Sequence, residues 1–231
     1  MHRLLLTALA AMIWTASSKA HHIWIIPERP EGPKATAVFG DTLEPQSPDI
    51  LKKVAHTRLY VREASGNEEL VEWTKGESSF SLEVKGKGTR TIGGTCVYGV
   101  ETMDHRLHKH VDPYLLVYYP KTVFGDVNGQ KPWERLPLEI IAEVAGGKAT
   151  LKVLFRGKPV PNAEMIVIGA GKDKVVLKPN DKGESVFEVK ESGVYGFRTR
   201  HIEPKAGVHF DKKYTEVRHY ASLVLPVTAK K

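Results

Sequence analysis

The sequence predicts an all-β protein built from two β-sandwich domains. Two observations support this fold class. Several segments alternate apolar and polar residues with a period of two, as TRLYVRE does at residues 57–63. The chain also contains 20 glycines and 14 prolines, which recur between such segments as turn signals. Short strands at regular spacing, separated by turns, are typical of antiparallel sandwiches.

Residues 1–20 have the three-part pattern of a secretory signal peptide. A short basic start at Met1–Arg3 precedes an apolar run at residues 4–14, and the small residues Ser18 and Ala20 follow. The apolar run is too short to span a membrane comfortably. We therefore expect cleavage after Ala20 and a periplasmic or otherwise extracytoplasmic protein. An uncleaved N-terminal anchor is the alternative.

The first domain is expected to span residues 21–145. It begins with a short apolar strand that Pro27 ends, and a second strand follows a proline-rich loop. The segment at residues 45–53 is expected to be a loop with one helical turn. The predicted strands of this domain are 23–26, 36–39, 57–63, 79–84, 94–100, 114–119 and 138–144.

The second domain is expected to span residues 146–231, because Ala145-Gly146-Gly147 interrupts the strand pattern. From there the chain alternates apolar segments with glycine- and proline-containing turns, as an antiparallel sandwich does. The predicted strands of this domain are 149–155, 165–170, 175–178, 184–189, 194–201 and 219–227.

Composition excludes some classes of function. The formal net charge is +7, and losing Arg3 and Lys19 with the signal would lower it to about +5. The basic residues are scattered and are not interleaved with aromatic residues, so nucleic-acid binding has little support. Cys96 is the only cysteine. An internal disulfide is therefore impossible, and we expect Cys96 to be a buried apolar residue.

Cleavage after Ala20 would make His21 the first residue of the mature chain. Its α-amine and its imidazole Nδ1 could then chelate one metal ion, because both groups offer a lone pair near neutral pH. His22 follows immediately. In an extended chain His22 points to the opposite face, so the two imidazoles need not share an ion.

A second group of histidines lies within residues 104–112, DHRLHKHVD, which has an aspartate at each end. His108 and His110 would share one face of a strand, whereas His105 and His108 would face together on a helical turn. Either pair suits a metal ion. The arginine and lysine of the same segment repel cations, so a solvated loop is the alternative.

A third group comprises His201, His209 and His219. His201 ends one predicted strand and His219 begins the last one, so antiparallel pairing would bring them together. A structural histidine that hydrogen-bonds a loop carbonyl is the alternative for His219. Because no second thiolate is available, a site here would combine histidine with carboxylate or water. Such ligands suit nickel, cobalt, copper or zinc.

Several longer segments resemble a known family. They are AHHIWIIP after the signal, YGVET before a strand ending YYPK, LFRGKPVPNAEMIV, NDKGESVFEV, SGVYGFRTRH and HFDKKYTEVRHYASLVLPV. Together they resemble a bacterial family of exported domains of unknown function described as the periplasmic component of nickel/cobalt uptake. The second domain also resembles the immunoglobulin- and transthyretin-like, carboxypeptidase-regulatory class of sandwiches. The resemblance implies roles for His21, His201 and His219, and DHRLHKH departs from the family pattern.

We therefore expect an exported, non-enzymatic protein that binds a divalent transition metal, with nickel or cobalt favoured. A membrane transporter or a metallochaperone would be its partner. The sequence contains no HExxH, GxSxG or Walker motif. One alternative is a structural or interaction module at the cell surface that binds no metal. Another is a copper enzyme with an N-terminal histidine brace.

Overall fold

A computed structural model describes residues 21–30, 32–104, 107, 109–169 and 174–229. The expected signal peptide lies outside these residues. The regular structure of the described residues consists of strands and one five-residue helix, so the all-β prediction is confirmed. None of the helical structure in these ranges is long and apolar enough to cross a membrane.

The N-terminal half contains eight strands and the helix α1 (Pro48–Lys52), which Ser47 caps. The strands are β1 (His22–Pro27), β2 (Lys34–Gly40), β3 (Arg58–Glu63), β4 (Glu68–Val71), β5 (Trp73–Lys75), β6 (Phe80–Glu83), β7 (Arg90–Asp104) and β8 (Lys109–Phe124).

The remaining strands form the C-terminal half. They are β9 (Leu138–Ala145), β10 (Lys148–Phe155), β11 (Lys158–Pro159), β12 (Met165–Ile168), β13 (Lys174–Leu177), β14 (Glu184–Glu188), β15 (Gly193–Glu203), β16 (Gly207–His209), β17 (Lys212–Tyr214) and β18 (Glu216–Val227). The sequence did not predict β4, β5, β11, β16 or β17, which are two to four residues long and lack a clear alternation.

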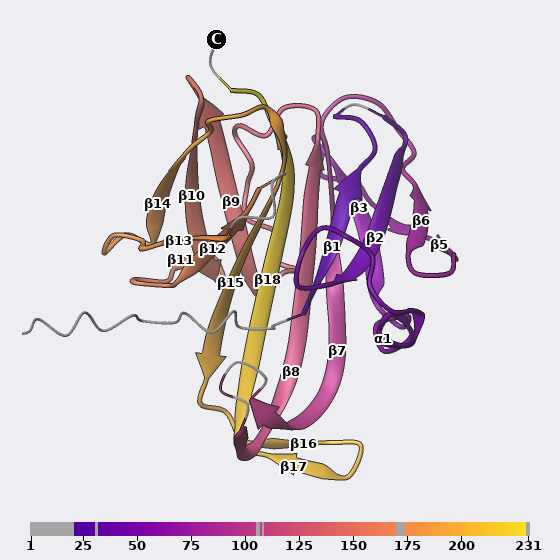
Figure 1. The fold of residues 1–231 in the computed structure, drawn as a ribbon, viewed down its shortest axis with the longest axis vertical. Helices are drawn as coiled ribbons and strands as arrows, with labels where there is room; N and C mark the ends of the chain where they lie inside the picture. Colours follow the sequence, from indigo (N-terminus) through magenta and orange to yellow (C-terminus); the bar gives the residue numbers. More distant parts are fainter. Residues whose placement is uncertain (1–20, 31, 105–106, 108, 170–173, 230–231) are drawn as a thin grey trace, which may run out of the picture.

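Three sheets make up the body of the molecule (Figure 1). The central sheet has the order β13-β12-β15-β18-β8-β7-β3-β4 and draws strands from both halves of the chain. The N-terminal sheet has the order β1-β2-β6-β5. In the C-terminal sheet, β10 pairs with β9, β11 and β14. A separate hairpin of β16 and β17 lies at one end.

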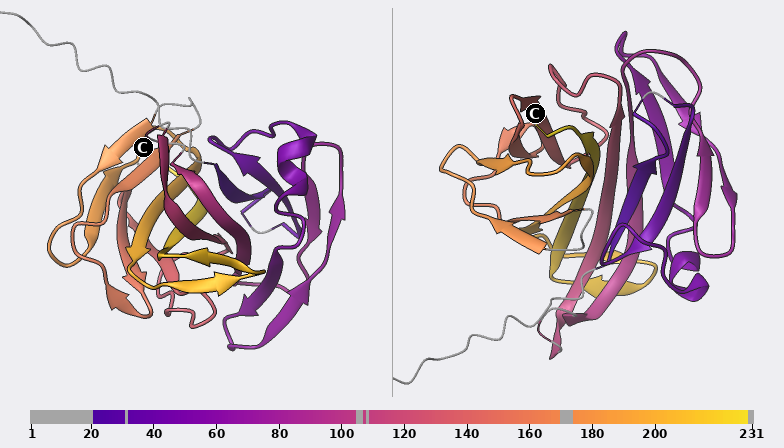
Figure 2. Two further views of the ribbon diagram at one scale, coloured as in Figure 1. Left: turned by 90° about the horizontal axis from the view of Figure 1, so that it is seen from below. Right: turned by 45° about the horizontal axis from the view of Figure 1, so that its top comes forward.

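The two smaller sheets cover opposite faces of the central sheet. Along β8, Val117 and Tyr119 pack into the core beneath the C-terminal sheet, whereas Leu116 and Tyr118 pack into the core beneath the N-terminal sheet. Figure 2 shows the N-terminal strands (indigo and purple) on one side and the C-terminal strands (orange) on the other, with β8 and β18 between them. Both central strands are therefore buried on both faces, which explains their nearly continuous apolar sequences.

β18 joins the two halves by pairing with β8 in parallel, from Glu216 opposite Tyr114 to Val224 opposite Thr122. The other pairs of the central sheet are antiparallel. A parallel pair requires a long connection, and here the whole C-terminal sheet lies between the two strands in the chain.

The boundary predicted between residues 145 and 146 falls inside a tight hairpin. β9 and β10 pair along their whole length, from Ala145 opposite Lys148 to Leu138 opposite Phe155. Gly146 and Gly147 form the two-residue turn, both with positive φ (58° and 76°), as a type I′ turn requires. By its pairing, β9 lies with the C-terminal strands.

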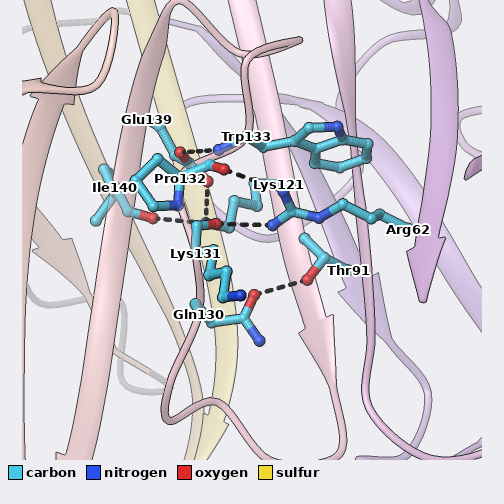
Figure 3. A network of polar contacts seen from close by, with 9 residues as sticks. All are labelled: Arg62, Thr91, Lys121, Gln130, Lys131, Pro132, Trp133, Glu139 and Ile140. Carbon is cyan, nitrogen blue, oxygen red and sulfur yellow. Dashed lines mark hydrogen bonds and ion pairs between the residues drawn. The ribbon is translucent and has the colours of Figure 1, made fainter. Parts of the chain in front are cut away.

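A buried ion pair ties the central sheet to the C-terminal sheet (Figure 3). Lys121 Nζ of β8 lies 2.5 Å from Glu139 Oε1 of β9 and donates to the Ile140 carbonyl at 3.1 Å. Glu139 Oε2 accepts from the Trp133 backbone N–H at 2.9 Å. Both charged side chains are only 2% exposed. Burial lowers the pKa of Lys121, although Glu139 acts in the opposite direction.

The same network holds the segment between β8 and β9. Arg62 of β3 donates to the carbonyls of Lys131 at 2.8 Å and Pro132 at 3.2 Å. Thr91 of β7 donates to Gln130 Oε1 at 2.7 Å. These bonds position Trp133, whose backbone N–H donates to the second carboxylate oxygen of Glu139 (Figure 3).

Removing one member of this pair should destabilise the protein strongly. Lys121→Met leaves the Glu139 carboxylate buried without its countercharge, a change that typically costs about 3–5 kcal/mol of unfolding free energy. The double variant Lys121→Met/Glu139→Leu should be more stable than Lys121→Met, because no charge remains buried. Urea unfolding of the original protein and of the two variants measures these differences in unfolding free energy. A double variant no more stable than the single one would contradict it.

Candidate functional site

His21 and Asp41 lie opposite each other at one end of the β1–β2 hairpin. The last described pair of that ladder is His22 with Gly40, so His21 and Asp41 are the next residues on each side. His21 Nδ1 is 3.8 Å from Asp41 Oδ1. The His21 side chain is 29% exposed and its ring packs against Phe39 with 5.3 Å between ring centroids.

Asp41 is a functional candidate that the sequence did not reveal. Its Oδ1 is buried and has no hydrogen-bond partner in the described part of the chain. A buried carboxylate oxygen normally has such a partner. Asp41 lies opposite His21 because of the pairing register of β1 and β2. Knowing where two strands lie in the sequence does not determine this register.

His22 has a different environment from His21, as an extended chain predicts. It is 3% exposed, and its ring stacks on Tyr220 at 5.3 Å and lies 5.5 Å from Trp24. Arg198 Nη1 lies 3.2 Å from His22 Nδ1. Since an arginine can only donate, His22 Nδ1 accepts this hydrogen bond. That nitrogen is therefore not free to bind a metal in this arrangement.

Positive charge also lies near Asp41. Burial lowers the pKa of Lys174, the charge of Arg198 lowers it further, and the charge of Asp41 raises it. The Asp41 carboxylate therefore lies near the positive charge of Lys174 as well as near the His21 imidazole. The negative charge of Asp41 favours a bound cation here, whereas the positive charges of Lys174 and Arg198 disfavour one.

His201 and His219 are direct partners in the β15–β18 ladder, as antiparallel pairing of these strands predicts. Their ring centroids are 6.3 Å apart. Phe155 of β10 packs against both rings, at 4.3 Å from His201 and 4.9 Å from His219. The structure thus brings these two histidines together, and their use as metal ligands stays a prediction.

Both ring nitrogens of His219 make hydrogen bonds. Tyr119 Oη is 2.8 Å from Nδ1, and Glu203 Oε2 is 3.1 Å from Nε2. Burial raises the pKa of the Tyr119 phenol, so its O–H donates to Nδ1. The neutral ring then donates from Nε2–H to the carboxylate. A metal at His219 would have to displace one of these two bonds.

Glu203 links His219 to the surface. Arg156 Nη2 lies 2.9 Å from both Glu203 carboxylate oxygens. Burial acts to raise the pKa of Glu203, but the hydrogen bonds from Arg156 and His219 outweigh it, so the pKa lies below its ordinary value. Glu203 is two residues from His201 on the same strand and so shares its face. This H-x-E spacing is the signal that could have identified it.

The predicted loop site is only partly described. His105 and His108 lie outside the described residues. His110 is exposed on β8, opposite Met103. Asp104 is buried and accepts from Arg218 Nη1 at 2.9 Å. Asp104 thus has a structural ion pair here.

Within the described ranges, no three histidine, cysteine, aspartate or glutamate residues are arranged to hold a metal ion. Cys96 is buried, and burial raises the pKa of its thiol to about 11. It is therefore a neutral thiol at physiological pH. His209 lies in β16, where its ring contacts Phe210.

Comparison with known proteins gives one family and several distant structures. The family model described as "Domain of unknown function (DUF4198)" matches residues 18–203. No curated protein matches the chain. The chain is similar to a two-domain fibronectin type-III segment from chicken tenascin, with 13% identity, a TM-score of 0.24, and coverage of 90% of this chain and 98% of that one.

Two further structures have similarly low sequence identities and TM-scores. A pullulanase from Anoxybacillus sp. LM18-11 is 13% identical over 78% of this chain and 24% of its own length, with a TM-score of 0.19. The D0-D1 domain of intimin is 14% identical over 84% of this chain and 90% of that one, with a TM-score of 0.20. Scores this low support no inference about activity.

The buried His219 and the partly buried His201 should make stability depend on pH. Burial lowers the pKa of His219 and of His201, with Glu203 opposing in both cases. As the pH falls through about 6.5, these side chains take up protons in the unfolded chain before they do so in the folded one. The stabilisation is therefore complete above about pH 6.5 and is lost as the pH falls below it. Urea midpoints at about pH 7.5 and about pH 5.5 should show this loss.

His219→Gln should reduce the difference between the two midpoints, because one of the two titrating groups is removed. His110→Gln, at an exposed position of β8, serves as the matched control and should leave the difference unchanged. The carboxylate of Glu203 stabilises the folded state at both of these pH values, because its pKa lies below the ordinary value and its stabilisation is lost only at lower pH. An unaltered pH dependence in His219→Gln would contradict this assignment.

Proposed function

The chain belongs to the DUF4198 family, and from that premise we propose that it is an exported, non-enzymatic protein that binds a divalent transition metal of the nickel or cobalt type. The proposed ligands are His21 and Asp41, together with the α-amine that cleavage after Ala20 would expose at His21. Since the family description assigns no activity, the proposal rests on this site.

The observation that carries the proposal is the buried Asp41 Oδ1 atom. It has no hydrogen-bond partner in the described residues and lies 3.8 Å from His21 Nδ1. A buried carboxylate oxygen without a partner is costly, and a cation between it and an imidazole nitrogen would remove that cost. Imidazole and carboxylate together suit nickel, cobalt, copper and zinc.

The α-amine would supply a third donor from the same residue. The backbone nitrogen of His21 directly precedes β1, so a chain cut there would place its amine at the end of the β1–β2 hairpin. Three donors leave coordination positions for water or for a partner's ligands. Such an incomplete shell suits a metal that is passed on, whereas structural metals are enclosed by four protein ligands.

His22 and His219 are poorly suited as metal ligands, because their ring nitrogens already make hydrogen bonds. His22 Nδ1 accepts a hydrogen bond from Arg198, and His219 uses both ring nitrogens. An N-terminal histidine brace for copper requires a second imidazole at the same ion, which disfavours that alternative. Lys174 and Arg198 reduce the negative potential near Asp41, so we expect moderate affinity.

Metal titration of the protein that begins at His21 tests the proposal. We expect nickel and cobalt to bind, and Asp41→Asn should weaken binding by about tenfold or more because a charged ligand is lost. A glycine added before His21 should weaken it as well, because the amine becomes an amide. Isothermal titration calorimetry measures both effects, with copper and zinc as comparison ions.

Asp49→Asn is the matched control, because the Asp49 side chain is exposed and pairs with Lys52 of α1 at 2.8 Å. It should leave the affinity unchanged. Equal affinities for the original protein and Asp41→Asn would reject the aspartate as a ligand. No binding below about millimolar metal would instead favour a metal-free interaction module.

A further inference from the structure

The hairpin of β16 and β17 ends in an unusual turn. His209 and Lys212 form its last pair, so Phe210 and Asp211 are the two loop residues. Both have positive φ, 44° and 61°. Such turns favour asparagine, aspartate and glycine, and a bulky side chain in this conformation is strained. Phe210 is also 87% exposed, so the strain is not offset by burial of its ring.

Other exposed apolar side chains gather at the same end of the molecule. Val208 is 62% exposed on β16, Ile202 is 40% exposed near the end of β15, and Leu107 is 60% exposed between β7 and β8. β17 contacts both β7 and β8, and Thr215 donates to the Pro113 carbonyl at 2.8 Å. Figure 1 shows the hairpin beside the lower ends of these strands. We call this surface, Phe210 with Val208, Ile202 and Leu107, the Phe210 end.

The Phe210 end is surrounded by positive charge. The exposed charged residues of its described part are Lys109, Lys205, Lys212 and Lys213, against Asp112 and Asp211. Glu203 is paired with Arg156, whereas Arg218 is shared by Asp104 and Glu216, so one of these two negative charges is not offset. The four exposed lysines still outnumber the three acidic groups that have no countercharge of their own, two exposed aspartates and one member of the Arg218 cluster. The net charge at this end is therefore positive, and the lysines flank the exposed phenylalanine in sequence and in the hairpin.

We propose that the Phe210 end binds an anionic lipid surface, with the Phe210 ring inserted among the head groups and the lysines paired with lipid phosphates. An aromatic ring partitions well into the membrane interface, and nearby lysines add attraction to anionic lipid. The strained turn holds the ring at the tip of the hairpin, where it contacts the neighbouring His209 ring and is otherwise exposed. This explains why an apolar residue occupies a position where asparagine or glycine would be more stable.

The shape of the surface favours lipid over a protein partner. A stable protein interface buries about 800 Å² on each side, over a fairly flat and well-packed surface. Here the most exposed apolar side chain lies at the tip of a two-residue turn, between strands of three residues. A narrow projecting tip inserts into a fluid head-group layer more readily than it packs against a folded surface.

Vesicle co-sedimentation tests the proposal. The protein that begins at His21 should sediment with vesicles of phosphatidylglycerol and phosphatidylcholine in equal parts, and much less with phosphatidylcholine alone. Binding should decrease with added salt and persist with a metal chelator present. The chelator separates this result from the metal proposal. Failure to sediment with either vesicle would overturn the inference.

The variant Phe210→Asn tests the role of the phenylalanine ring most directly. It should lower vesicle binding about tenfold and raise the thermal midpoint, because asparagine tolerates positive φ better than phenylalanine. Lys212→Gln/Lys213→Gln should also lower binding, by about tenfold. Val186→Asn and Lys190→Gln, at exposed positions of the C-terminal half away from this end, are the matched controls. Unchanged binding in Phe210→Asn, or equal losses in the controls, would contradict the inference.

Discussion

The parallel pairing of β18 with β8 is the contact on which the rest of the structure depends. It joins strands about a hundred residues apart and converts two groups of antiparallel strands into one eight-stranded sheet. Because the sheet continues through this pair, each smaller sheet finds an apolar face to cover, one on either side. Without it, β8 and β18 would each lose a hydrogen-bonded neighbour and leave the backbone groups of one edge unpaired.

Burial on both faces has consequences for the polar groups of these two strands. Lys121 and Thr122 on β8, and Ser222 and His219 on β18, all lie in the interior and all have hydrogen-bond partners. A shift of either strand by one residue would exchange their faces and leave these groups without partners. The buried polar contacts thus specify the register that the apolar residues alone define weakly, since both faces of these strands are apolar.

The candidate metal site depends on the same arrangement. β1 packs against β18 and β8, where His22 lies between Arg198 and Tyr220. This anchoring fixes the start of β1, and with it the position of His21 opposite Asp41. The two proposed functional surfaces differ in character: the first rests on a buried carboxylate oxygen, and the second on exposed apolar and basic side chains at the Phe210 end.

Local sequence determined the fold class and most of the strands. Period-two alternation in TRLYVRE acts within a few residues, so β3 can be read from the chain. The paired glycines after Ala145 mark the end of a strand, but they predict a domain boundary where the structure has the β9–β10 turn. The sequence also placed His201 near His219, because consecutive long strands usually pair.

Tertiary structure alone decided the sheet order and the chemistry of the histidines. Nothing near Lys121 in the sequence marks Glu139 as its partner, and nothing near His21 marks Asp41. Likewise the bond from Tyr119 to His219 joins strands that are distant along the chain. The physical reason is that alternation and turn residues act over a few residues, whereas register and burial arise from packing between distant segments.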